Sequence, residues 1–180
     1  LDETTEEDLR KAVEHARQRV SQVAARKGLS PDLGTTLTMA YVAWPALHLV
    51  HVGDSRAYLY RSGELFLLTR DHNLAEEMVR RKVLTEAQAR ASHFTRLLTN
   101  AVAGSGAAAE AELHKLTLEP RDLLLLCTDG LYSEVEDAEI ASRLGDVTSP
   151  DLVEPCVRSL VLAANRAGGR DNVTAVLARF

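Results

Sequence analysis

Apolar residues in the first 27 positions recur with the period of an amphipathic helix, so we predict a helix over residues 2–27. Its acidic first turn contains the spacing of a capping box at Thr5 and Asp8, and Gly28 follows as a stop signal. The positions that define the buried stripe are Leu9, Val13, Ala16, Val20 and Val23 or Ala24.

From Gly34 the helical period gives way to short runs rich in leucine, aromatic and β-branched residues. The runs cover residues 35–44, 46–52, 56–62, 64–69, 123–127 and 173–178. The connections among the first four runs are too short for a parallel return, so we expect antiparallel neighbours. Several runs are apolar on both faces, whereas an antiparallel sheet usually leaves one face in water. We therefore predict an α+β fold, a four-layer α/β/β/α sandwich of two antiparallel sheets flanked by helices.

Two further stretches have helical character. Residues 74–98 are charged and contain short helical pieces, the second of which is capped by Thr85 and Gln88. We interpret this stretch as a helical flap on the surface. A later helix is expected to start at Ser149, which precedes a proline, and to end at Gly168.

The composition is that of a soluble globular protein, with 46% hydrophobic and 26% charged residues. A length of 180 residues suits one domain over residues 1–180. The net charge of −5 argues against a general affinity for nucleic acid. No apolar run approaches the roughly 18 residues of a membrane span. Cys127 and Cys156 form no disulfide framework, so we expect a reducing, cytoplasmic location.

Three acidic residues stand next to the ends of apolar strands. Asp54 and Asp129 each follow such a strand, and Asp171 precedes the one that is expected to start at Val173. Taken singly, each is an ordinary turn residue. Carboxylates gathered at one rim of a sandwich would repel one another unless a cation lay between them. Because oxygen-only ligation suits Mg²⁺ or Mn²⁺, the set indicates a site for one of these ions.

Five motifs, in order along the chain, resemble those of the metal-dependent protein phosphatases of the protein phosphatase 2C type. They are "GTTLT" at 34–38, "VGDSRAYL" at 52–59, "TRDHNL" at 69–74, "LLLLCTDGL" at 123–131 and "GGRDNVT" at 168–174. The matches extend from Gly34 to Phe180, and their spacing fits the bacterial branch of the family, flap included. The resemblance implies the two-sheet sandwich that the strand pattern also predicts.

The resemblance further implies two or three Mn²⁺ or Mg²⁺ ions and hydrolysis of phosphoserine or phosphothreonine in proteins by a metal-activated water. By motif match, Asp129 and Asp171 would bind the first ion. Asp54 would belong to a weaker third-metal site beside the flap, where Ser92 is a candidate neighbour. His72 and His93 could be flap or substrate-side residues, but we expect them to be exposed loop histidines. The substrates would be phosphoproteins made by an opposing serine/threonine kinase in bacterial signalling.

Two family motifs do not occur in this sequence, an Arg-x-x-Asn-Glu-Asp stretch and an Asp-Gly-x-Gly-Gly turn. In the family they precede the long helix and supply sheet strands, a phosphate-binding Arg and an Asp that bridges both metals. We therefore expect an N-terminally truncated catalytic domain whose remaining site residues are metal ligands, with weak or no turnover alone. The alternative is a non-catalytic phosphatase-like module that binds a partner protein. Retention of all three aspartates favours the enzyme.

Overall fold

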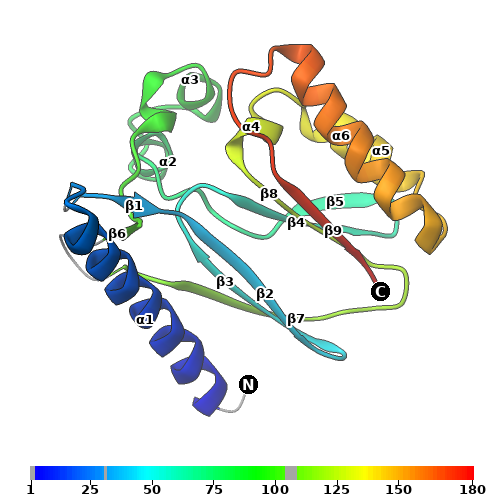
Figure 1. Cartoon of the computed structure of the whole chain (residues 1–180). Coiled ribbons are helices and arrows are strands. Elements are labelled where there is room, and N and C mark those ends of the chain that lie inside the picture. Colours follow the sequence, from blue (N-terminus) through cyan, green and yellow to red (C-terminus); the bar gives the residue numbers. More distant parts are fainter. Residues whose placement is uncertain (1–2, 31, 104–108) are drawn as a thin grey trace. The chain divides into compact units, whose positions relative to one another are not determined.

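A computed structural model of the chain describes residues 3–30, 32–103 and 109–180, and the chain forms two compact units (Figure 1). Unit 1 comprises Leu1–Ala43, Leu47–Asp54 and Asp71–Leu116. Unit 2 comprises Trp44–Ala46, Ser55–Arg70 and Thr117–Phe180. The single domain over residues 1–180 stays a prediction.

Unit 1 contains a long N-terminal helix, a three-stranded sheet, a two-stranded sheet and a set of short helices. Its helices are α1 (Glu3–Lys27), α2 (Leu74–Arg80), α3 (Glu86–Arg90) and the 3₁₀ helix η1 (His93–Arg96). Its strands are β1 (Gly34–Thr35), β2 (Leu37–Ala43), β3 (Ala46–Val52), β6 (Val102–Ala103) and β7 (Glu112–Thr117). The strand orders are β2-β3-β7 and β1-β6. The predicted stripe of α1 packs against buried residues of β3, Val50 and Val52.

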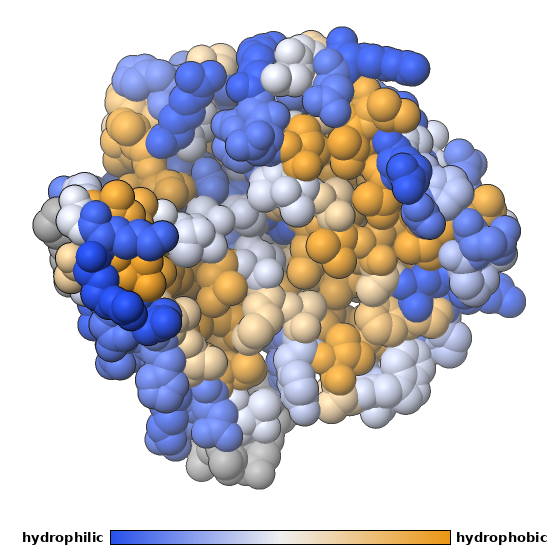
Figure 2. Space-filling model, viewed as in Figure 1, coloured by the Kyte–Doolittle hydropathy of each residue, from blue (hydrophilic) through white to orange (hydrophobic). Residues whose placement is uncertain are grey.

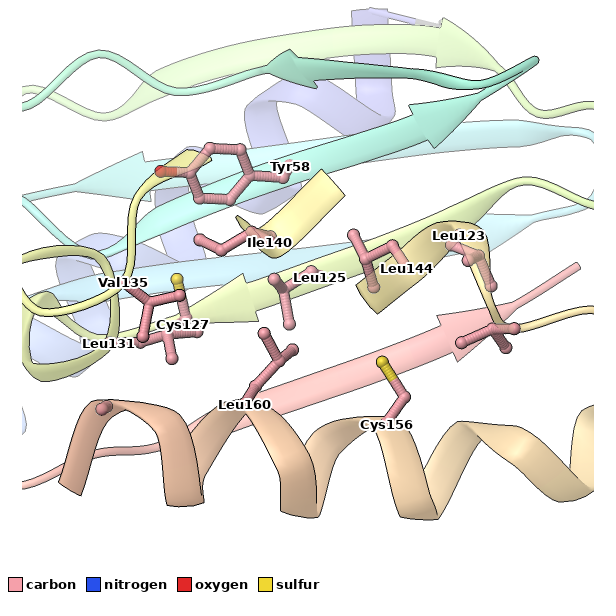
Figure 3. Packing of buried hydrophobic residues seen from close by; sticks show 12 residues of the cluster. Tyr58, Leu123, Leu125, Cys127, Leu131, Val135, Ile140, Leu144, Cys156 and Leu160 are labelled. Atoms are coloured by element: carbon pink, nitrogen blue, oxygen red, sulfur yellow. The ribbon is translucent and has the colours of Figure 1, made fainter. Parts of the chain in front are cut away.

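Unit 2 contains one antiparallel sheet in the order β5-β4-β8-β9. Its strands are β4 (Arg56–Arg61), β5 (Glu64–Leu67), β8 (Leu123–Cys127) and β9 (Ala175–Arg179). Its helices are α4 (Asp129–Tyr132), α5 (Asp137–Gly145), the 3₁₀ helix η2 (Pro150–Leu152) and α6 (Val153–Ala167). The helices bring Leu131, Ile140 and Leu160 onto Leu125 of the sheet, and all four side chains are buried (Figure 3). Full burial of each is worth roughly 1.5–3 kcal/mol, so this core fixes β8 against the helices.

Most predicted strands are confirmed within one or two residues, but three details of the helices and strands are wrong. The runs at 46–52 and 56–62, expected to be antiparallel neighbours, form β3 and β4, which belong to different sheets. Helix α1 already includes Glu3, so Thr5 lies inside the helix and is not its N-cap. Strand β9 begins at Ala175, two residues later than expected, because Val173 and Thr174 still belong to the preceding loop. The capping box at Thr85 and Gln88 is confirmed, with both reciprocal bonds present.

Part of β2 departs from the expectation that both of its faces are covered. The second half of the strand is exposed, and so are other large apolar side chains. The face of the molecule shown in Figure 2 has several orange, hydrophobic areas at its surface. The exposed residues of strands or strand ends are Tyr41, Val42, Trp44, Phe66, Leu67 and Val176. Among the described strands β2 and β9 are also sheet edges, the kind of strand that pairs readily with further chain. None of the described helices has the length and apolarity that crossing a membrane requires.

Candidate metal centre

Asp129 and Asp171 both lie next to the same end of the β8–β9 strand pair. Cys127, the last residue of β8, lies opposite Ala175, the first residue of β9. Just beyond this pair the Thr128 N–H donates to the Thr174 carbonyl oxygen at 3.1 Å. Since Asp129 is the next residue after Thr128, and Asp171 lies on the incoming loop, both leave the sheet at the same edge.

A single threonine hydroxyl holds the two loops against each other. Thr128 Oγ1 accepts a hydrogen bond from the Thr174 N–H at 3.0 Å and donates one to the Asn172 carbonyl oxygen at 3.3 Å. Gly130 is in contact with the same carbonyl, because a Cβ added there would lie 2.3 Å from it. The glycine of the "TDG" motif is therefore required by close backbone approach.

Each of the two carboxylates is oriented by the residue that follows it. Asp129 Oδ1 accepts from the Gly130 N–H at 2.9 Å, and Asp171 Oδ1 accepts from the Asn172 N–H at 2.7 Å. Both residues are exposed. An ionised carboxylate offers about four lone-pair positions, so one backbone bond leaves capacity for a cation. Both carboxylates are therefore oriented and accessible from solvent, as cation ligands must be.

Ser133 and Glu134, the two residues that follow α4, brace this part of the chain. The buried Glu134 side chain pairs with Arg170 at 3.2 Å, next to Asp171. Ser133 stands where the family often has another Asp, and its hydroxyl donates to the Asp129 carbonyl oxygen at 2.6 Å. Sequence reasoning missed the Glu134–Arg170 pair, since neither residue shows a periodic signal.

Asp54 lies in unit 1, at the turn that follows β3. The turn depends on Gly53, whose φ is +111°, and a Cβ added at this residue would lie 2.3 Å from the Thr36 side chain. Asp54 itself is half-buried. The pair formed by Asp129 and Asp171 belongs to unit 2, so a shared site with Asp54 stays a prediction.

The Ser92 hydroxyl acts as a helix cap in this structure. Ser92 Oγ accepts from the Phe94 N–H at 3.3 Å at the start of η1, and the Ser92 carbonyl accepts from the Thr95 hydroxyl at 3.1 Å. A role for Ser92 near a metal stays a prediction.

The expectation that His72 is an exposed loop residue is wrong. Its side chain is only 10% exposed, and it lies with His51 and Glu112 in a cluster whose ligand-type atoms are all within 4.8 Å of one another. The three residues come from distant parts of the sequence, so no local motif could have revealed the cluster.

The antiparallel α+β fold, with Asp129 and Asp171 next to the same end of β8 and β9, agrees with the phosphatase class that the sequence motifs resemble. The chain belongs to the protein phosphatase 2C family, whose model matches residues 1–178.

Named relatives are similar over most of this chain. It is 38% identical to the serine/threonine protein phosphatase PstP of Mycobacterium tuberculosis over 161 residues. These residues make up 88% of this chain and 30% of PstP. It is 30% identical over 169 residues to the serine/threonine phosphatase Stp of Listeria monocytogenes, or 94% of this chain and 66% of that protein. The chain thus spans under one third of PstP.

Solved structures of relatives confirm the predicted α+β class with antiparallel sheets. Stp1 from Staphylococcus aureus has a TM-score of 0.89 at 27% identity, covering 100% of this chain and 69% of that chain. The catalytic domain of PstP in complex with two manganese ions has a TM-score of 0.77 at 32% identity, covering 91% of this chain and 66% of that chain.

Thr128→Val is expected to lower the free energy of unfolding by about 1 kcal/mol, because the Thr174 N–H and the Asn172 carbonyl both lose a partner. Urea denaturation measures the change. Thr148→Val, on the exposed connection after α5, is the control, with an expected change within about 0.5 kcal/mol. Equal losses in the two variants would contradict the bracing role of Thr128.

Proposed function

We propose that the protein to which this chain belongs is a protein serine/threonine phosphatase that hydrolyses phosphoserine and phosphothreonine with Mn²⁺ or Mg²⁺. The observation that supports the proposal is that Thr128 hydrogen-bonds to Asn172 and Thr174, which places Asp129 and Asp171 next to the same end of β8 and β9. Two exposed, oriented carboxylates on adjacent loops form an oxygen donor set of the kind that these cations prefer.

In this proposal Asp129 and Asp171 bind the first ion, and Asp54 contributes to a further, weaker site. The bound cations supply a nucleophilic water at neutral pH and neutralise charge on the phosphoryl oxygens. The chain's own contribution is to hold the carboxylates in position. Their backbone hydrogen bonds fix the side-chain orientation, and the Thr128 and Glu134 contacts fix the two loops.

The phosphate-binding Arg and the bridging Asp of the family motifs are not in this sequence, so we propose weak or no turnover for residues 1–180 alone. The proposed substrates are phosphoproteins, made by an opposing serine/threonine kinase in the cytoplasm. The missing motifs also favour a second candidate function, a phosphatase-like module that binds a partner without catalysis.

The test is Mn²⁺-dependent release of phosphate from a phosphothreonine peptide by the full-length protein, with a phosphotyrosine peptide as the control substrate. We expect turnover of the first peptide that EDTA abolishes and added Mn²⁺ restores. A full-length protein that binds Mn²⁺ but releases no phosphate from either peptide would favour the non-catalytic module.

A further inference from the structure

The cluster of His51, His72 and Glu112 in unit 1 has the composition of a metal site with two histidines and a carboxylate. His51 is fully buried, its ring lies 4.8 Å from that of His72, and Glu112 Oε2 lies 3.5 Å from His72 Nε2. Whether a cation can bind depends on which ring nitrogen of His72 carries the proton, because a ligating nitrogen must offer a lone pair.

The hydrogen bonds around His72 assign that proton. Nδ1 faces two donors, the Gly53 N–H at 3.2 Å and the Asn100 side-chain amide at 2.9 Å. The Asn100 amide is itself fixed, because its oxygen accepts from the Glu110 N–H while its nitrogen donates to the Glu110 carbonyl. Nδ1 is therefore an acceptor, and in the neutral ring the proton lies on Nε2, facing Glu112. A cation bound to Nε2 would require the proton to be on Nδ1. The Nδ1–H would then face the N–H groups of Gly53 and Asn100, which are donors too.

The same contacts show what His72 does in place of binding a metal. Gly53 and His72 are joined twice, since the His72 N–H also donates to the Gly53 carbonyl at 2.7 Å. On its other side the His72 carbonyl accepts from the Thr99 N–H at 2.9 Å, and Asn100 reaches Nδ1. Both ends of the segment from Asp71 to Asn100, which contains the flap helices, are thus fastened through His72 to the turn that carries Asp54.

We propose that His72 is a positioning residue that fixes the orientation of the Asp54 carboxylate and couples it to the root of the flap. The turn at Gly53 is held by Thr36 packing on one side and by His72 hydrogen bonds on the other, so Asp54 has little freedom relative to residues 71–100. The proposal rests on the proposed function, in which Asp54 binds a cation. It makes a residue of the flap root, Asn100, a determinant of cation affinity at Asp54.

The test compares two replacements of His72 that keep different halves of the ring. Asn places an amide oxygen near the position of Nδ1 and keeps the acceptor, whereas Gln extends toward Nε2 and loses it. We expect His72→Gln to speed hydrogen exchange of the Gly53 amide about tenfold and His72→Asn to keep it near wild type. Asn100→Ala removes the second donor to His72 Nδ1 and so tests the same hydrogen bonds by a change in the flap root. His93→Gln, an exposed histidine of η1, is the matched control and should change nothing.

The second readout is Mn²⁺ itself, followed by the paramagnetic broadening of backbone amides in this chain. For ions that broaden the amides of residues 53–55, we expect the dissociation constant to rise about tenfold in His72→Gln and Asn100→Ala and to be restored in His72→Asn. Affinity reported by residues 128–131 should stay unchanged, because the side-chain hydrogen bonds of Thr128 go to Asn172 and Thr174 within unit 2.

The outcomes separate the two proposals. Unchanged Gly53 exchange in His72→Gln, or a change in exchange without a change in Mn²⁺ affinity at residues 53–55, overturns the positioning role. The positioning role is also contradicted if Mn²⁺ broadens the wild-type amides of residues 128–131 but not those of residues 53–55. That result would still support the first metal site. Absence of broadening at residues 128–131 contradicts the proposed function, and exchange at Gly53 still reports whether His72 holds the turn.

Discussion

Replacing Asp129 or Asp171 by Asn in the full-length protein is expected to lower kcat for a phosphothreonine peptide by about 10³-fold, roughly 4 kcal/mol of transition-state stabilisation. Asn has the size of Asp and its oxygen can still accept from the following backbone N–H, so the loops keep their geometry. What the substitution removes is the negative charge that would hold the cation in the proposed site. The fall should therefore reflect lost metal, with little change in the free energy of unfolding.

Calorimetric titration of residues 1–180 with MnCl₂ tests the same assignment without relying on turnover. We expect weak binding by the unmodified chain, which lacks the bridging Asp motif, and at least about tenfold weaker binding by Asp129→Asn. Asp146→Asn, an exposed residue at the end of α5, is the charge-matched control and should bind as the unmodified chain does. If Asp129→Asn titrates like the unmodified chain, the ligand assignment is wrong.

The double variant of Asp129 and Asp171 is informative because the proposed function has the two residues bind one ion. Once either carboxylate is lost the first site is disabled, so the second substitution should add little. Two independent, fully additive losses would mean that the carboxylates serve different ions or different steps.

The strands and the main site loops could be predicted because their signals are local. The run "LLLLC" and the following Thr128-Asp129-Gly130 place a buried strand and a sharp exit in consecutive residues, and the structure has both. Strand β7 was missed, because in the sequence "ELHKLT" polar residues interrupt the apolar ones and its burial is only intermediate. The short helix α4 was missed as well, because it is too short to show a helical period.

The surroundings of His72 could not be predicted from the sequence, because they depend on contacts between distant segments. The protonation and partners of His72 follow from Gly53, Asn100 and Glu112, which the fold brings together from three different strands and loops. The error at Thr5 has a simpler cause. Several acidic residues open this helix, so a capping-box spacing occurs one turn inside the true start.

The stability of unit 2 is expected to depend strongly on Asp122, at the start of β8. The carboxylate is almost completely buried and accepts from Arg61 through both oxygens, at 2.8 Å and 2.6 Å. It also accepts from the Glu119 N–H at 2.7 Å, while Arg61 donates to the Thr117 carbonyl at 2.8 Å. Asp122→Ala would leave the Glu119 N–H without this partner, while Arg61 keeps the Glu119 carboxylate at 2.9 Å and the Thr117 carbonyl. We expect a cost of about 1.5–3 kcal/mol in the free energy of unfolding.

The pH dependence of this contribution has a definite sign. Burial raises the pKa of Asp122, but the hydrogen bonds from Arg61 and the Glu119 N–H outweigh it, and the net pKa lies below the ordinary value. A carboxyl group whose pKa is lower in the folded state stabilises the fold above its unfolded pKa of about 3.9. The contribution is then lost as the pH falls through the lower, folded pKa.

Urea denaturation of wild type and Asp122→Ala between pH 7 and pH 2.5 measures both effects together. The difference in unfolding free energy should be largest at neutral pH and should shrink below about pH 4, because protonation of Asp122 in the wild type removes the same ion pair. Glu154→Ala is the control, since its pair with Arg158 at 2.7 Å is about three quarters exposed and is expected to be worth under 1 kcal/mol. A difference for Asp122→Ala that is as small as the control, or that stays constant down to pH 2.5, would show that the buried pair does not govern the stability of this unit.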